Sequence, residues 1–227
     1  NFKNKIYELN NVNIYAIEHG KGPLVIMVHG WPESWYSWRH QINPIAKMGY
    51  KVIAIDVRGY GNSSKPHEIE KYDMLSLVGD LLNIIDKENE EKAILIGHDW
   101  GAPICWNTAA LHPNKIRAVI GLSVPYSKRG KVSNIELWKL LYKDKFFYQI
   151  YFQEEGKAEK ELEKDIETSL RKIYYWGSGE GRDAKIRSNP DKNSTLLDGL
   201  IDPKPFPKWL SEEDLNFYVD QFKHSGF

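Results

Sequence analysis

The sequence has a single cysteine and no excess of charge of either sign. Cys105 cannot form a disulfide within the chain, so we expect a reducing compartment and a cytoplasmic location. Lysine plus arginine and aspartate plus glutamate each number 31, so the net charge is zero. The bulk charge therefore gives no indication of a nucleic-acid partner or of an anionic membrane surface.

Long apolar segments and metal-binding patterns are also absent. No run reaches the about 18 apolar residues of a membrane-spanning helix, so we expect no membrane span. The first residues, NFKNKIYELN, lack the apolar core of a signal peptide. No cluster of cysteine and histidine has the spacing of a metal site, and no glycine-rich loop suits a phosphate. We expect neither a metal nor a cofactor.

The first half of the chain alternates strand and helix patterns. Residues 5–20 predict a hairpin that turns at Asn10 and Asn11. Continuous apolar runs, typical of strands buried on both faces, occupy residues 23–30, 51–59, 93–97 and 116–123. Helical patterns lie between them at Trp35–Lys47, Tyr72–Lys87 and Trp100–Leu111. This order predicts an α/β fold with a mainly parallel sheet and helices on both of its faces.

The strand patterns stop after Pro125. Charged amphipathic segments follow at residues 134–152, 157–176 and 211–226, and Ser211 is a suitable N-cap for the last. Residues 177–195 are polar and glycine-rich, which predicts a surface loop. We therefore predict two domains, an α/β core with the first six strands at residues 1–126 and an all-helical domain at residues 127–227.

The stretch ILIGHDWGAPIC has the outline of a nucleophile elbow, with Asp99 at the position of the nucleophile. Such a residue lies on a sharp turn from a strand to a helix, and its neighbours two positions away must be small. Gly97 and Gly101 meet that requirement. The positive end of the helix that follows would keep the Asp99 carboxylate ionised.

A second motif, VHGWPESWYSW, follows the third strand. In an α/β-hydrolase, one oxyanion-hole N–H comes from the loop after this strand and the other from the residue after the nucleophile. Trp31 and Trp100 hold these two positions. We expect His29 to be a packing residue, and Asp56 to form an ion pair with Arg58.

The motifs HGWPESWYSWRHQI, DVRGYGNSSKP and GHDWGA resemble those of the soluble epoxide hydrolases of the α/β-hydrolase superfamily. The segment FYQIYFQEEGKAEKELEKDI resembles their helical cap, so we expect the second domain to be a cap inserted into the α/β-hydrolase core. Haloalkane dehalogenases share the HDWG pattern, but they usually carry asparagine at the position of Trp31. A haloalkane dehalogenase is therefore the alternative.

The resemblance implies hydrolysis of epoxides to vicinal diols through a covalent alkyl ester on Asp99. Tyr148 matches one of two cap tyrosines that donate to the epoxide oxygen in this family, whereas Tyr151 is expected to pack. A small hydrophobic epoxide and water would be the substrates. The expected lining of the substrate pocket is Trp31, Pro32, Trp100 and Tyr148.

The family places its catalytic histidine and the acid that orients it after later strands, and its second tyrosine further along the cap. None of the seven histidines here has such a position. We therefore expect full turnover only if these residues are supplied from outside the chain. The sixth strand would have an open edge, which a homodimer or a complementing C-terminal segment would cover. A non-catalytic ligand-binding or partner-binding protein is a further alternative.

Overall fold

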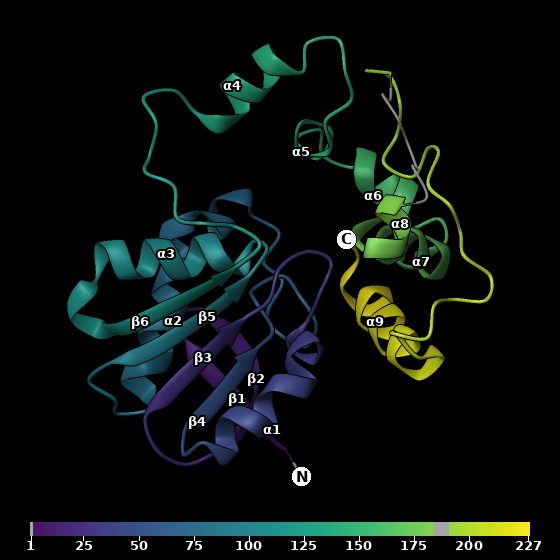
Figure 1. The fold of residues 1–227 in the computed structure, drawn as a ribbon. Coiled ribbons are helices and arrows are strands. Elements are labelled where there is room, and N and C mark those ends of the chain that lie inside the picture. Colours follow the sequence, from purple (N-terminus) through teal and green to yellow (C-terminus); the bar gives the residue numbers. More distant parts are fainter. Residues whose placement is uncertain (1, 184–190) are drawn as a thin grey trace. The chain divides into compact units, whose positions relative to one another are not determined.

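The chain forms two compact units, Asn1–Ser127 and Lys128–Phe227, in a computed structural model that describes residues 2–183 and 191–227 (Figure 1). The first unit contains a six-stranded sheet with helices on both of its faces. Helices and their connections form the second unit. Each unit has its own buried apolar side chains.

The sheet of the first unit has the strand order β1-β2-β4-β3-β5-β6. Its strands are β1 Lys3–Leu9, β2 Val12–Gly20, β3 Leu24–Val28, β4 Lys51–Ile55, β5 Ala93–His98 and β6 Ile116–Leu122. β1 and β2 form the expected hairpin, with Asn11 in the left-handed region at φ 67°. β2 is antiparallel to β4, and the remaining neighbours are parallel. The predicted α/β class is confirmed.

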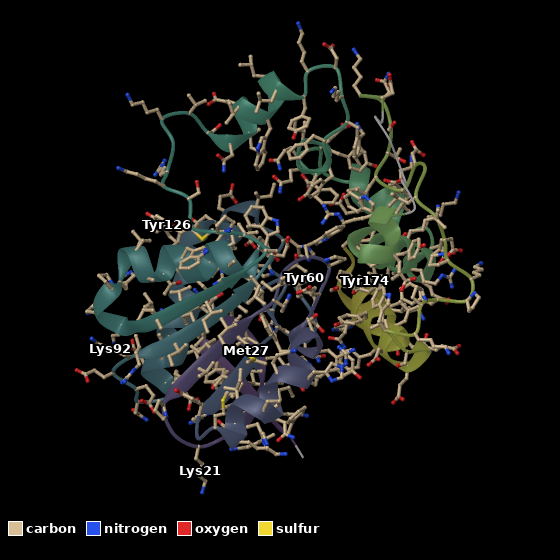
Figure 2. The ribbon with its side chains drawn as sticks, viewed as in Figure 1. Lys21, Met27, Tyr60, Lys92, Tyr126 and Tyr174 are labelled. Carbon is tan, nitrogen blue, oxygen red and sulfur yellow. The ribbon has the colours of Figure 1, made fainter. Side chains whose placement is uncertain are left out.

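The parallel strands are buried on both faces, as their apolar runs predicted. Leu24, Ile26 and Val28 of β3 belong to one core cluster with side chains of α2 Met74–Lys87 and α3 Gly101–Leu111. Met27 points to the opposite face and is fully buried (Figure 2). The helix α1 Arg39–Lys47 contacts β2 and β4. Covering both faces removes the central strands from water.

The helices of the first unit begin a little later than their sequence patterns do. The pattern from Trp35 starts as a 3-10 turn, η1 Trp35–Trp38, which leads into α1. A second 3-10 turn, η2 Ile69–Tyr72, precedes α2, which begins where the Asp73 carboxylate accepts the N–H of Ser76 at 2.6 Å. A third, η3 Pro113–Lys115, leads into β6.

The second unit is built from six helices among the residues described. They are α4 Asn134–Leu141, α5 Tyr148–Tyr151, α6 Lys157–Leu162, α7 Ile166–Gly177, α8 Gly179–Asp183 and α9 Glu212–Ser225. The two longer amphipathic segments are therefore each interrupted, the second where Asp165 caps α7. Ser211 caps α9 as predicted, in a reciprocal capping box with Asp214.

The segment expected to be a loop, residues 177–195, contains the short helix α8. The loop prediction is wrong there, because three glycines in the pattern GSGEG are compatible with a single helical turn once Ser178 caps it through the N–H of Gly181. Residues 184–190 lie outside the described residues. Within the described ranges no helix is both long and apolar enough to cross a membrane.

A partly buried cluster of charges links the end of α2 to the strands. Glu88 follows α2 directly, and its side chain is only 2% exposed. Its carboxylate accepts hydrogen bonds from Lys5, Tyr7 and Lys51, which come from β1 and β4. Burial would raise the pKa of Glu88, but these hydrogen bonds outweigh it and lower the pKa to about 2.

We predict that Glu88→Gln destabilises the fold at neutral pH. Because the folded pKa of about 2 lies below the ordinary value of 4.5, ionised Glu88 stabilises the protein above pH 4.5 and loses this effect as the pH falls to about 2. The expected loss at pH 7 is on the order of 3 kcal/mol of unfolding free energy. Urea unfolding of wild type and variant at a series of pH values measures it.

The matched control is Glu91→Gln, because Glu91 is exposed on the same stretch of chain. We expect it to leave the unfolding free energy nearly unchanged. An equal loss of unfolding free energy in the two variants, or a Glu88→Gln effect that persists below pH 2, would contradict the stabilising role of the ionised Glu88 carboxylate.

Candidate active site

Asp99 lies at the turn from β5 into α3 with a positive φ of 49°. Residues other than glycine rarely adopt this left-handed conformation, although aspartate tolerates it better than most. The turn is also tight. A Cβ atom at Gly97 would come within 2.4 Å of the Gly101 carbonyl oxygen, and one at Gly101 within 2.0 Å of the Val28 carbonyl oxygen. The two glycines are thus sterically required, as the elbow motif predicted.

The loop after β3 passes directly over this turn. A Cβ atom at Gly30 would lie 2.4 Å from the Cβ of Asp99, so only glycine fits there. The backbone N–H of Trp31 donates a hydrogen bond to Oδ1 of Asp99 at 2.9 Å. One carboxylate oxygen is therefore held by the backbone of the neighbouring loop.

Trp100 follows Asp99 and is the N-cap of α3. The first N–H groups of a helix have no partner within the helix, so the turn presents backbone donors around the carboxylate. Trp100 is 48% exposed, whereas Pro32, in the loop after β3, is buried. The structure thus brings together Asp99, Trp31 and Trp100 at the ends of two adjacent strands.

His29 is a packing residue, as expected. Its ring is 1% exposed, with Nδ1 at 2.8 Å from the Gly30 carbonyl oxygen and Nε2 accepting the N–H of Val57 at 2.9 Å. These partners assign the proton to Nδ1 in a neutral ring. Burial also lowers the pKa of His29. Tyr60 packs edge-on against the His29 ring at 4.9 Å between centroids.

The expected ion pair between Asp56 and Arg58 is wrong. Asp56 is fully buried and accepts the backbone N–H groups of Trp35 and Asn62, at 2.9 and 3.0 Å. Arg58 instead forms a two-pronged ion pair with Asp80 of α2, at 3.0 and 2.6 Å. The chain leaves β4 before Asp56, so two loop N–H groups reach its carboxylate and the guanidinium turns toward α2. Burial raises the pKa of Asp56.

Sequence reasoning missed a pair beside the nucleophile, Glu33 and His98. Oε1 of Glu33 lies 2.9 Å from Nδ1 of His98, and Oε2 accepts the N–H of Gly30 at 3.0 Å. Burial would raise the pKa of Glu33, but the hydrogen bond and charge of His98, together with the hydrogen bond from the Gly30 N–H, outweigh burial and lower the pKa. The same bond raises the pKa of His98. Glu33 therefore links the loop to the residue that precedes Asp99.

Tyr148 and Tyr151 lie on α5 in the second unit. Tyr151 is 8% exposed and its hydroxyl donates to Glu161 at 2.8 Å, which confirms the packing role expected for it. The Tyr148 ring packs near Phe152 and Trp176, and its hydroxyl accepts a hydrogen bond from the Gln149 side chain at 3.0 Å. The two hydroxyls thus have different surroundings.

The fold family follows from comparison with known proteins. The family of the alpha/beta hydrolase fold matches residues 23–177. The structure is similar to the crystal structure of epoxide hydrolase A from Mycobacterium thermoresistibile, with a TM-score of 0.94, 40% identity, and coverage of 100% of this chain and 72% of that one. It is also similar to an epoxide hydrolase from an endophytic Streptomyces, with a TM-score of 0.92 and 40% identity over 99% of this chain and 69% of that one.

A relative from Mycobacterium tuberculosis, epoxide hydrolase A, is 38% identical over 226 residues, which cover 98% of this chain and 70% of the relative. The chain belongs to the epoxide hydrolases of the alpha/beta hydrolase fold, as its motifs predicted.

We predict that Glu33→Gln lowers the pKa of His98 toward the ordinary value of 6.5, because the substitution removes the charge that favours the imidazolium. In the wild type the pair stabilises the fold fully below pH 6.5 and loses this effect as the pH rises through the folded pKa. A proton NMR titration, with the His98 signal assigned by its loss in His98→Asn, measures the shift.

Glu70→Gln, at an exposed position of η2, is the control and should leave the His98 titration unchanged. An identical His98 titration in wild type and Glu33→Gln would show that the pair does not govern the pKa of this ring.

Proposed function

We propose that the protein hydrolyses epoxides to vicinal diols through a covalent ester on Asp99. The observation that carries the proposal is the carboxylate at the elbow with the Trp31 N–H on its Oδ1. A carboxylate is ionised at neutral pH and needs no general base to attack an epoxide carbon. An elbow serine or cysteine hydrolase is incompatible with an aspartate at this position.

In the first half-reaction, Oδ2 of Asp99 attacks a ring carbon and the carbon–oxygen bond of the epoxide breaks. The ring oxygen leaves as an alkoxide that takes a proton, and Tyr148 is the donor proposed from the family resemblance. The product is an alkyl ester on Asp99 with a neighbouring hydroxyl group. The hydrogen bond from Trp31 fixes the carboxylate so that one oxygen remains for attack.

In the second half-reaction, water attacks the ester carbonyl and the backbone N–H groups of Trp31 and Trp100 hold the oxyanion. The step needs a histidine base. His29 does not suit it because both ring nitrogens already bond to the backbone, and His98 is paired with Glu33. We propose that the base and its acid are those that the family carries after later strands. The chain spans 70% of its relative from Mycobacterium tuberculosis, which is consistent with this.

Two alternative functions, a haloalkane dehalogenase and a non-catalytic binding protein, have less support. The relatives described above are epoxide hydrolases by name, and Trp31 stands where haloalkane dehalogenases usually have asparagine. A non-catalytic binding protein would not need the strained Asp99 turn with a backbone donor at its carboxylate.

We predict that a small aromatic epoxide forms a one-to-one covalent adduct with the chain and that Asp99→Asn abolishes it. An amide is a poor nucleophile, so the rate of adduct formation should fall at least about 100-fold. Intact-mass spectrometry over time measures it. Asp86→Asn, an exposed position on α2, is the control that should react like the wild type. Equal labelling of Asp99→Asn and wild type would contradict the proposal that Asp99 is the nucleophile.

A second prediction separates the two tyrosines of α5. Tyr148→Phe should slow adduct formation by roughly 10- to 100-fold, because the leaving alkoxide loses a proton donor. Tyr151→Phe should leave the rate within about twofold, since that hydroxyl bonds to Glu161 within the second unit. Single-turnover mass spectrometry gives both rates. A reversed order of the two effects would reject Tyr148 as the donor.

A further inference from the structure

The helix α4 presents an apolar ridge to solvent. Leu137, Leu140 and Leu141 are 44%, 78% and 65% exposed. Residues at positions i, i+3 and i+4 lie on one face of a helix, so the three side chains form a single ridge. Large apolar side chains gathered on one exposed face of a helix are typical of a surface that meets a partner or a membrane.

The other face of α4 anchors the helix to its own unit. The ring of Trp138 packs against Phe147 at 5.2 Å between centroids, and Tyr142 stacks on the same ring at 4.2 Å. At the start of the helix, Ser133 and Glu136 form a capping box. The helix is therefore preformed with its leucine ridge turned away from these aromatic side chains.

The chain around the ridge is basic, although the whole sequence is neutral. Residues 128–145, which we call the α4 surface, contain six lysines and arginines but only two acidic residues. The six basic residues are all exposed, namely Lys128, Arg129, Lys131, Lys139, Lys143 and Lys145. None of them forms an ion pair with a described residue. One of the two acids, Glu136, is engaged in the capping box.

We propose that the α4 surface docks peripherally on an anionic lipid bilayer, with the leucine ridge at the acyl boundary and the cations at the headgroups. A short helix with a few leucines binds a bilayer weakly, and so does a cluster of cations, but the two together give a stable attachment. The exposed cations of the α4 surface are complementary to negatively charged headgroups, which favours anionic lipid. A protruding ridge flanked by cations suits a deformable surface, whereas a protein partner would need a matching groove. This proposal is independent of the catalytic assignment.

The test is co-sedimentation of the whole chain with vesicles of phosphatidylcholine alone or with about one third phosphatidylserine. We expect at least about tenfold tighter binding to the anionic vesicles, and loss of that preference in high salt, because salt screens the headgroup charge. Equal binding to the two kinds of vesicle, or no binding to either, would overturn the proposal.

Two sets of substitutions locate the binding. Leu137→Ser, Leu140→Ser and Leu141→Ser together, and separately Lys139→Gln, Lys143→Gln and Lys145→Gln together, should each reduce binding to anionic vesicles at least about tenfold. Circular dichroism shows whether the leucine substitutions alter folding. If they do, the lysine variant still tests the proposal.

Matched controls replace exposed residues elsewhere. The apolar control combines Met48→Ser, Ile69→Ser and Leu75→Ser, at positions 67–69% exposed. The charge control combines Lys21→Gln, Lys92→Gln and Lys208→Gln, all exposed (the first two are labelled in Figure 2). The proposal would be overturned if these control variants lost binding to anionic vesicles as strongly as the variants of the α4 surface. A leucine set that instead converts a dimer to a monomer in light scattering would also overturn it, because the ridge would then be an interface between copies.

Discussion

The candidate site depends on the close approach of two backbone turns at the ends of adjacent parallel strands. β3 and β5 are paired in register, with Val28 beside Gly97, so the loop after one strand meets the elbow after the other. The approach is so close that Gly30 and Gly101 have no room for a Cβ atom. The Trp31 N–H reaches the Asp99 carboxylate only because of this contact. The chemistry is thus set by backbone atoms, which the sheet holds in place.

Two carboxylates, one buried and one partly buried, stabilise this arrangement without taking part in the proposed reaction. Asp56 holds the N–H of Trp35 and so fixes the far end of the loop that carries Trp31. Glu33 holds the near end through Gly30 and ties it to His98. Each carboxylate stabilises a backbone turn that has no helix or strand partner of its own, which is what a buried acid needs to offset its desolvation.

The sequence predicted the elements and motifs that depend on local patterns. The buried strands, the Asp99 elbow, the glycines around it and the Ser211 cap all follow from apolar runs or from steric requirements over a few residues. The partners of charged side chains did not follow. Arg58 lies two residues from Asp56 but pairs with Asp80 of another element, and Glu33 meets His98 from a different strand end. Those pairings depend on how distant elements pack against one another, which local patterns do not specify. The short helix α8 was missed because its capping hydrogen bond overrides its glycine content.

Tandem mass spectrometry that locates the epoxide adduct in the sequence decides whether Asp99 is the nucleophile. Tryptic cleavage after Lys92 and Lys115 yields a peptide in which Asp99 is the only acidic residue. We expect the added mass on Asp99, as an ester that hydroxylamine removes. Mass retained on Cys105 or on a histidine of the same peptide, or found in another peptide, would mean that Asp99 is not the nucleophile.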